Sequence, residues 1–469
     1  MPLPVISLAQ MRDWECATWA AGRTEAEVIR RVGQKIAARA CALTCPGDTI
    51  LILAGKGHNG DDARAAQEFL NERNVILLNV ADPLAAIEGL LRTTNASPAL
   101  FIDGLFGIGL NRELDDGWRH FIATVSELKI PVLAVDVPSG LNADTGETFG
   151  TAIEAAITLT IGAPKIGMLA QPAWPFVGRL EVAEDVGLIP CPCKTELNWT
   201  LPEDFRNFPP RRAAAGHKGS FGHLQIVAGS HGFHGAAVLA ARAAQRAQPG
   251  LVTLSTDERI YGAVAAQLQA VMVNVWKPEM KFAAASAILI GPGLAMPEQS
   301  DEMKAITRRS WRDLEIPLIV DASALDWLPV GKFFKDAVRV ITPHPGEAAR
   351  LLKTSPATIQ KNRVDSLREL SRRFGNCWVV LKGHQTLVGR GTGEIFVNPS
   401  GNPHLAQGGS GDVLAGFIAG LLAQPALQTD PGQTIRYAVW QHGAAADQLQ
   451  ASRANWIVDD LPAELGNAR

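Results

Sequence analysis

A glycine-rich loop followed by an acidic residue stands near the C-terminal end of the chain, in NPHLAQGGSGDVLAGFIAGLLAQ. Three glycines and Ser410 precede Asp412, and an apolar helical stretch follows to about Ala423. Consecutive backbone N–H groups at the start of a helix form an anion site. Asp412 stands where it can take a proton from a hydroxyl group facing a phosphate. The alternative is that Asp412 is a first-turn charge that favours the helix dipole.

Other turns in the same half carry groups that suit nucleotide binding. The segment KGHQT (Lys382 to Thr386) follows a buried-looking strand and offers a backbone turn, a cation and a hydroxyl for a phosphate or ribose. The segment TPHPGE brings His344 and Glu347 to the start of a helix, where a lone histidine can equally be structural. Small-residue turns such as GPGL (Gly291 to Leu294) complete this set.

The N-terminal half has its own glycine turn, in TILILAGKGHNGDDARAAQEFL. Gly55 to Asp62 lies directly between an apolar strand and an Ala-rich helix. Glycines let backbone N–H groups approach an anion, and the helix N-terminus adds donors. The motif is shorter than the full dinucleotide fingerprint, and many α/β turns resemble it.

Two further strand ends in this half carry acidic residues. FIDGLFGIGLNRE contains Asp103, and AVDVPSGLNADTG contains Asp136 and Ser139. Ligands of open parallel sheets sit at the carboxyl edge of the strands, so we expect these side chains to face one crevice with the glycine turn. The alternative is that both aspartates only cap helices or stabilise turns.

Apolar runs separated by helix-like stretches position these motifs. Strands that are apolar throughout are buried on both faces by helices, which predicts an α/β fold with a doubly wound, Rossmann-like N-terminal domain. A Pro-rich, turn-rich segment from about Ile189 to Arg212 is the expected linker, and a second α/β domain follows. The predicted strands are Thr49–Ala54, Val75–Val80, Ala99–Asp103, Val132–Val137, Ile157–Ile161, Leu224–Ala228, Leu251–Ser255, Ala287–Gly291, Pro317–Ala322, Val338–Thr342 and Trp378–Gly383.

Composition narrows the class of protein. The chain has 469 residues, 47% of them hydrophobic, which favours two domains, and its formal net charge of −3 gives no global attraction to nucleic acid. No apolar run approaches the roughly 20 residues that span a bilayer, and the N-terminus does not read as a secretory signal. We therefore expect a cytoplasmic protein with small-molecule partners, no nucleic acid and no membrane.

Six cysteines are few for this length, and none has the CxxC spacing of a structural zinc site. Reduced thiols in a cytosol fit this pattern best. Metal chelation by Cys41 with Cys45, or by Cys191 with Cys193, is the alternative.

The three N-terminal motifs, in this order and spacing, resemble the NAD(P)H-hydrate epimerase domain. The resemblance implies a K⁺ site formed by Asn59, Asp103 and Ser139, whose hard oxygen donors suit that ion. It also makes Asp103 a candidate for proton transfer at the nicotinamide C6, and leaves open whether Asp103 is a base or an ion ligand. The residues implied to contact the hydrated nucleotide are His58, Asn59, Gly60, Asp61, Asp62, Gly107, Ile108, Gly109, Leu110, Asn111, Arg112, Glu113 and Asp136.

One position departs from the family pattern. The family shows Asn-Asn-Gly-Gly-Asp where this chain has His58 to Asp62, so Asp61 replaces a glycine. Such a change can forbid a positive φ and can repel a phosphate.

The C-terminal motifs resemble the ribokinase-like domain of the ADP- or ATP-dependent NAD(P)H-hydrate dehydratases. The resemblance implies that Ala236, Gly293 and His344 face the hydrated nucleotide together with the catalytic Asp412. The residues implied to hold the adenine nucleotide are Lys382, Gly383, His384, Gln385, Thr386 and Gly411.

Together the two resemblances imply a bifunctional repair enzyme. Residues 1–195 would epimerise the R and S hydrates of NADH and NADPH, and residues 196–469 would dehydrate the S hydrate with ADP and Mg²⁺, releasing AMP and phosphate. We expect a homo-oligomer. Two alternatives stay open: a ribokinase-type small-molecule kinase with an inactive N-terminal binding domain, and a non-enzymatic interaction protein.

Overall fold

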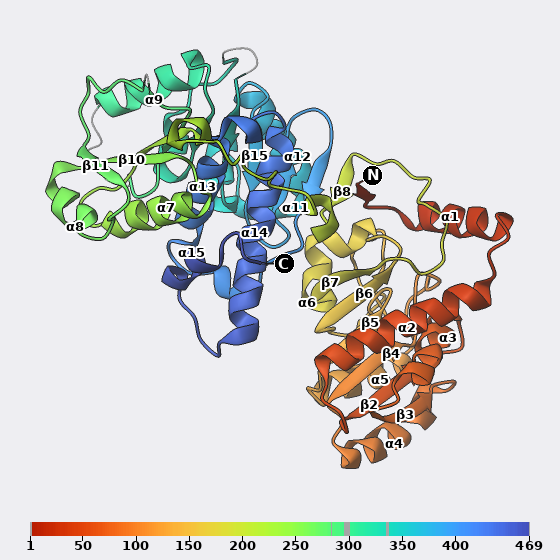
Figure 1. Cartoon of the computed structure of the whole chain (residues 1–469). Coiled ribbons are helices and arrows are strands. Elements are labelled where there is room, and N and C mark those ends of the chain that lie inside the picture. Colours follow the sequence, from red (N-terminus) through yellow and green to blue (C-terminus); the bar gives the residue numbers. More distant parts are fainter. Residues whose placement is uncertain (1, 283, 295–300, 334–336, 469) are drawn as a thin grey trace. The chain divides into compact units, whose positions relative to one another are not determined.

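The computed structural model describes residues 2–282, 284–294, 301–333 and 337–468. These residues form two compact units, Leu3–Thr195 and Glu196–Arg469, shown in Figure 1. Each unit has a β-sheet and a hydrophobic core of its own. The prediction of an α/β protein is confirmed.

The N-terminal unit contains a parallel sheet with the strand order β3-β2-β4-β5-β6-β7. All five predicted strands are present, with ends within two residues of those expected. The sixth, β7, was missed because RLEVA mixes charged and apolar residues at the sheet edge. The strands of this sheet are β2 (Thr49–Ala54), β3 (Asn74–Asn79), β4 (Leu100–Gly104), β5 (Val132–Val135), β6 (Ile157–Ile161) and β7 (Arg179–Ala183), and the short β1 (Leu3–Pro4) is not part of it.

Helices cover both faces of this sheet. Ile50 and Ile52 of β2 share a core cluster with the buried faces of α2 and α3, whereas Leu51 and Leu53 point to the other face and to α4 and α5. This alternation explains why the strand is apolar throughout. The helices are α1 (Leu8–Ala20), α2 (Glu25–Leu43), α3 (His58–Ala66), α4 (Pro83–Thr93), α5 (Asp116–Glu127) and α6 (Trp174–Val177).

The C-terminal unit contains a mixed sheet with the strand order β8-β17-β16-β15-β14-β13-β12-β9-β10-β11. Strands β9 to β15 pair in parallel, and β16 forms antiparallel pairs with both β15 and β17. The strands are β8 (Leu197–Trp199), β9 (His223–Val227), β10 (Leu251–Thr256), β11 (Met272–Val275), β12 (Ala287–Ile290), β13 (Leu318–Val320), β14 (Arg339–Ile341), β15 (Trp378–Leu381), β16 (Leu387–Gly389) and β17 (Ile395–Val397).

The helix α13, which follows the glycine loop, lies in the core of this unit. A Cβ at Gly416 would lie 2.1 Å from the carbonyl oxygen of Ala240 in α7, so these two helices touch through their backbones. The helices are α7 (His234–Arg246), α8 (Tyr261–Ala265), α9 (Asp301–Asp313), α10 (Pro345–Leu352), α11 (Pro356–Lys361), α12 (Arg363–Arg373), α13 (Ser410–Leu422), α14 (Pro431–Ser452) and α15 (Leu461–Glu464).

The expected linker from about Ile189 to Arg212 is not wholly irregular. Its middle forms β8, which pairs in parallel with β17 over three residues. This strand was not predicted from the sequence, because Leu197–Trp199 is too short to show an alternating pattern. No helix in the described part of the chain is long and apolar enough to cross a membrane.

Candidate active sites

Asp412 lies in the first turn of α13, next to the bend that starts this helix. Gly409 precedes the helix with a φ of 99°, which glycine adopts without strain, and no side chain caps the helix. Burial raises the pKa of Asp412 to about 7; Asp321 and Glu347 add to the rise, and Lys382 opposes it. A carboxyl group with a pKa near neutrality suits proton transfer.

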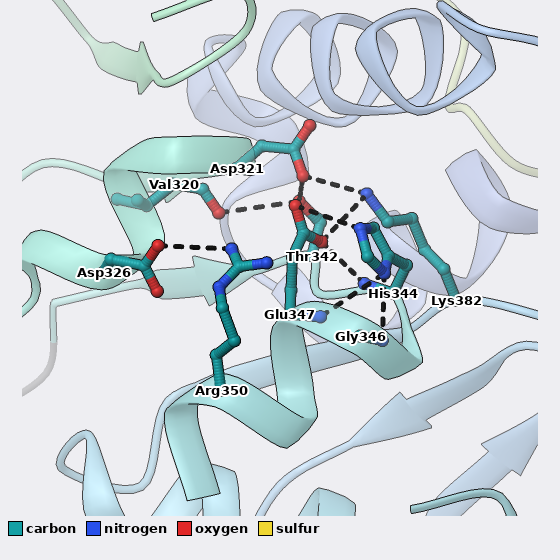
Figure 2. A network of polar contacts seen from close by, with 9 residues as sticks. All are labelled: Val320, Asp321, Asp326, Thr342, His344, Gly346, Glu347, Arg350 and Lys382. Atoms are coloured by element: carbon teal, nitrogen blue, oxygen red, sulfur yellow. Dashed lines mark hydrogen bonds and ion pairs between the residues drawn. The ribbon is translucent and has the colours of Figure 1, made fainter. Parts of the chain in front are cut away.

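Lys382 is the cation that acts on Asp412. Its Nζ lies 3.0 Å from Oδ1 of Asp321 and 3.8 Å from Oε2 of Glu347 (Figure 2). Burial acts against the ammonium, but Asp321, Glu347 and Asp412 outweigh it and raise the pKa of Lys382. A Cβ at Gly411 would lie 3.2 Å from Nζ of Lys382, so the structure brings these two predicted nucleotide-binding residues together.

Asp321 and Thr342 belong to this cluster and were not among the predicted site residues. They follow β13 and β14, while Lys382 follows β15, so the three residues end neighbouring parallel strands. Thr342 donates a hydrogen bond of 2.6 Å to Oδ1 of Asp321. The signal for Asp321 was present in the sequence, because an Asp directly after an apolar run marks a strand end.

His344 caps the N-terminus of α10. Its Nδ1 accepts hydrogen bonds from the backbone N–H groups of Gly346 at 3.0 Å and Glu347 at 3.3 Å, and Glu347 accepts one from the His344 backbone N–H. His344 therefore has a structural role as a helix cap, as the sequence allowed. Its ring is also half exposed, with 53% of the side-chain surface accessible, so a ligand can still reach it.

Arg363 of α12 stabilises the turn from Lys382 to Thr386 by hydrogen bonds to its backbone. Arg363 donates hydrogen bonds to the carbonyl oxygens of Leu381, Lys382 and Gln385, at 3.1, 3.4 and 3.5 Å. Burial lowers the pKa of Arg363 to about 10. Gly383 and Gln385 both have positive φ, and His384 is exposed. This positioning arginine lies in an ordinary charged helix, and the sequence offered no signal for it.

Ala236 and Gly293, the other predicted contacts of the substrate, lie side by side. A Cβ at Gly293 would be 2.9 Å from Cβ of Ala236, and Gly293 has a φ of 66°. In the same turn, a Cβ at Gly291 would be 1.9 Å from the carbonyl oxygen of Asp321. The turn that holds Gly293 therefore packs against the backbone of Asp321.

The glycine turn of the N-terminal unit leads into α3. A Cβ at Gly60 would lie 2.1 Å from the carbonyl oxygen of Gly55, so only glycine fits there. Asp61 is inside α3, does not have a positive φ and pairs with Arg64 at 2.8 Å. The glycine that the family shows at position 61 is therefore not required by the backbone of this chain.

The side chains of the three predicted K⁺ ligands are connected by hydrogen bonds next to this turn. Ser139 Oγ lies 2.6 Å from Asp103 Oδ1 and 3.2 Å from the carbonyl oxygen of Phe106, which accepts a 2.9 Å hydrogen bond from Asn59. Asp103 is fully buried, and burial raises its pKa to about 6 against the hydrogen bonds from Ser139 and Leu105. These oxygen donors are a chemically suitable set for K⁺, with the Phe106 carbonyl as an addition that the sequence did not reveal.

Asp136 follows β5 with a φ of 63°, and its Oδ1 accepts hydrogen bonds from Ile161 N at 2.9 Å and from Nζ of Lys165. Lys165 is fully buried and also donates to Thr160 Oγ1 and Ile161 O, both at 2.9 Å. Lys165 was missed, although a single lysine in the apolar segment ITLTIGAPKIGML was a visible signal.

A cavity of about 890 Å³ opens beside these groups. Helix α1 adds residues that no motif had indicated, among them Glu15 and Trp19. Gly60, Asp61, Glu113, Asp103 and Ser139 are not in its lining. The predicted residues that line the cavity are His58, Asn59, Asp62, Gly107, Ile108, Gly109, Leu110, Asn111, Arg112 and Asp136.

The alternative of a cysteine metal site finds no support. All six cysteines are free thiols, and within the described ranges no three His, Cys, Asp or Glu side chains gather in a way that could hold a metal ion.

Comparison with known proteins gives the family. Residues 224–467, more than half of the chain, match the family model described as NAD(P)H-hydrate dehydratase, and residues 81–167 match the one described as YjeF-related protein N-terminus. The bifunctional NAD(P)H-hydrate repair enzyme Nnr of Gloeobacter violaceus is 34% identical over 98% of this chain and 96% of its own length. The chain belongs to the bifunctional NAD(P)H-hydrate repair enzymes.

Other NAD(P)H-hydrate repair enzymes are similarly related. The one from Coxiella burnetii is 32% identical over 94% of this chain and 93% of its own length. Among solved structures, the ADP/ATP-dependent NAD(P)H-hydrate dehydratase of Bacillus subtilis, co-crystallised with ATP/Mg²⁺, is 30% identical with a TM-score of 0.50. It covers 55% of this chain and 92% of its own.

As a member of this family the protein combines an NAD(P)H-hydrate epimerase and an ADP/ATP-dependent NAD(P)H-hydrate dehydratase. The predicted identity and the ribokinase-like fold of the C-terminal half are confirmed. The two alternatives, a small-molecule kinase and a non-enzymatic interaction protein, lose their basis, because the relatives match both halves together.

Proposed function

We propose that residues 196–469 dehydrate the S hydrate of NADH and NADPH, with ADP as the phosphoryl donor and Asp412 as the base. The supporting observation is the position of Asp412, which lies at the start of α13 among Lys382, Asp321 and Glu347 with a pKa raised to about 7. A base tuned to neutrality beside backbone amides and a cation suits phosphoryl transfer.

The adenine nucleotide would bind at the turn from Lys382 to Thr386 and at Gly411. The Bacillus subtilis dehydratase was co-crystallised with ATP and magnesium, which supports an adenine nucleotide with Mg²⁺ as the cosubstrate. A magnesium ion is usually held by substrate phosphates with one or two carboxylates, and Glu347 is a suitable carboxylate near Lys382. When bound, the ion supplies positive charge to the phosphates. His344, Ala236 and Gly293 would face the hydrated nicotinamide.

The residues of the chain then act in two stages. Asp412 takes the proton of the C6 hydroxyl group. The oxygen of that hydroxyl group attacks the terminal phosphoryl group of ADP, and AMP leaves. The N–H groups at the start of α13 and the ammonium of Lys382 stabilise charge on the transferred group. The C6–O bond then breaks with its electron pair on the departing phosphate, a water molecule takes a proton from C5, and the electron pair of that C–H bond forms the C5–C6 double bond of the working cofactor.

The epimerase activity belongs, in this proposal, to residues 1–195. The hydrated nucleotide would occupy the cavity beside the glycine turn, in contact with the 107–113 loop and Asp136. Asn59, Asp103 and Ser139 would hold K⁺, which supplies a fixed positive charge behind the turn. Of the two roles left open for Asp103, its complete burial and its hydrogen bonds to Ser139 favour the ion ligand over the base.

We place the protein in the cytoplasm, which six free thiols support, and expect a homo-oligomer whose partners are small molecules.

Product analysis tests the C-terminal assignment. The purified protein is incubated with mixed hydrates, ADP and magnesium, while absorbance follows regenerated NADH and chromatography follows the nucleotides. The proposal expects NADH, AMP and inorganic phosphate in equal amounts. A stable phosphorylated product without NADH would instead indicate a kinase.

A further inference from the structure

Asp62 stands out among the residues that line the N-terminal cavity. The residue is only 7% exposed, yet no hydrogen bond or ion pair within the described chain reaches its carboxyl group. A buried carboxyl group normally has a partner, so this one is available to a molecule in the cavity. Asp62 lies on α3, three positions after Asn59, a proposed K⁺ ligand.

Asp136 lines the same cavity from a different element, the turn after β5. Its contacts are asymmetric: Oδ1 accepts from Ile161 N, Thr160 Oγ1 and Lys165 Nζ, whereas none of the described residues donates to Oδ2. The Nζ of the fully buried Lys165 donates to Oδ1 and so fixes the orientation of the Asp136 carboxyl group. Asp136 therefore presents a held carboxylate oxygen, and Asp62 a carboxyl group without a protein partner.

We propose that Asp62 and Asp136 are the acid and the base of C6 epimerisation, and that Lys165 is the positioning residue that orients Asp136. The proposal rests on the assignment of the epimerase activity to residues 1–195. It gives catalytic roles to two side chains that the sequence marked only as substrate contacts, and a role to Lys165, which the sequence did not mark.

The chemistry of the hydrated ring requires such a pair. C6 carries both a hydroxyl group and the ring nitrogen N1. Asp62 donates its proton to the hydroxyl, the C6–O bond breaks with its electron pair on the departing water, and the lone pair of N1 forms a double bond to C6. Water then adds to the opposite face as Asp136 takes a proton from it, and the N1–C6 π pair returns to N1. At the end Asp136 carries a proton and Asp62 has lost one, so the two residues can act in the reverse direction with their roles exchanged.

The electrostatic surroundings fit these roles. Burial raises the pKa of Asp62 to about 8, and the carboxylates of Asp136, Asp61, Glu15 and Glu25 add to the rise. Asp62 is thus protonated near pH 7. A carboxyl group that is protonated near neutrality suits the role of the acid.

The test measures conversion of purified R hydrate to S hydrate by the full-length protein without ADP, after subtraction of the spontaneous rate. Asp62→Asn and Asp136→Asn should each lower the rate by about 100-fold or more. Asp13→Asn, an exposed carboxylate of α1 outside the cavity, is the matched control and should stay within twofold. A folded Asp62→Asn variant that keeps a rate within threefold of the wild type overturns the proposal.

Lys165 is tested by the same rate, separated into kcat and KM. Lys165→Met should lower kcat by about tenfold or more with KM changed by less than about threefold, whereas Lys165→Arg, which keeps a donor to Asp136, should stay near the wild type. A kcat of Lys165→Met within about threefold of the wild type overturns the assignment of Lys165. If Lys165→Met does not fold, Lys165→Arg still tests the charge, because a 100-fold loss in that folded variant contradicts the proposal.

These outcomes separate this inference from the assignment of the epimerase. A wild-type protein that does not convert R hydrate at all contradicts the epimerase assignment itself. A wild type that converts it, together with active Asp62→Asn and Asp136→Asn variants, contradicts only the acid and base roles.

Discussion

The ammonium nitrogen of Lys382 lies 3.0 Å from Oδ1 of Asp321 and connects the ends of β15 and β13. Glu347 and Asp412 act on the same ammonium from α10 and α13. One cation therefore lies among three carboxylates, which repel one another without it. The stability of this site and the protonation of its base depend on the same lysine.

Lys382→Met is expected to lower the free energy of unfolding by about 3 kcal/mol, because it leaves Asp321 and Glu347 without their cation. It also raises the pKa of Asp412 further, so dehydration at pH 7 slows. Urea unfolding measures the first effect. The matched control is Lys304→Met, whose pairing with the exposed Asp301 should contribute less than about 1 kcal/mol. Equal losses in both variants would contradict the account.

The raised pKa of Asp412 makes a second prediction. Between its ordinary value of 3.8 and the raised value of about 7, the folded protein holds a proton that the unfolded chain has lost. This contribution to stability is complete below about pH 4 and is lost as the pH rises through 7. Asp412→Asn should therefore be more stable than the wild type at pH 8, by roughly 1 to 3 kcal/mol. At pH 5 the stability difference between the variant and the wild type should be smaller. A variant that is less stable at pH 8 would refute the burial argument.

The glycine turn of the N-terminal unit allows a matched pair of substitutions. Gly60→Ala should destabilise this unit by about 1 to 3 kcal/mol, because its Cβ would lie 2.1 Å from the Gly55 carbonyl oxygen. Gly57→Ala has open space around its Cβ and should change stability by less than about 1 kcal/mol. Thermal unfolding followed by circular dichroism compares the two, and equal midpoints would show that the turn tolerates a side chain.

Asp103→Asn should block the epimerase and spare the dehydratase. Loss of the buried carboxylate removes the charged member of the proposed K⁺ site, so R hydrate should be consumed only at its spontaneous rate, with S hydrate and ADP still giving NADH. The wild type should also unfold at a higher temperature in K⁺ than in choline, and the variant should lose this difference. A variant that converts R hydrate normally would exclude Asp103 from the site.

How far the sequence determined these sites can be judged from individual residues. Asp412, Asp103 and Asp136 were predictable, because each ends an apolar run or starts an apolar helix next to glycines. Asp321 had the same signal and was overlooked. Lys165 and Arg363 act through long side chains on groups far away in sequence, from 18 to 29 residues distant, and such contacts are fixed only by tertiary packing. The strand β8 was missed because it has only three residues and because its partner β17 lies far along the chain.

The central claim is that Asp412 is the base of ADP-dependent dehydration. Its most direct test is the single-turnover rate of NADH formation from S hydrate, ADP and magnesium, with the enzyme in excess, for the wild type and Asp412→Asn. The account predicts a fall of about 100-fold or more, with ADP affinity changed by less than threefold. A variant that folds, binds ADP and forms NADH at a rate within tenfold of the wild type would contradict it.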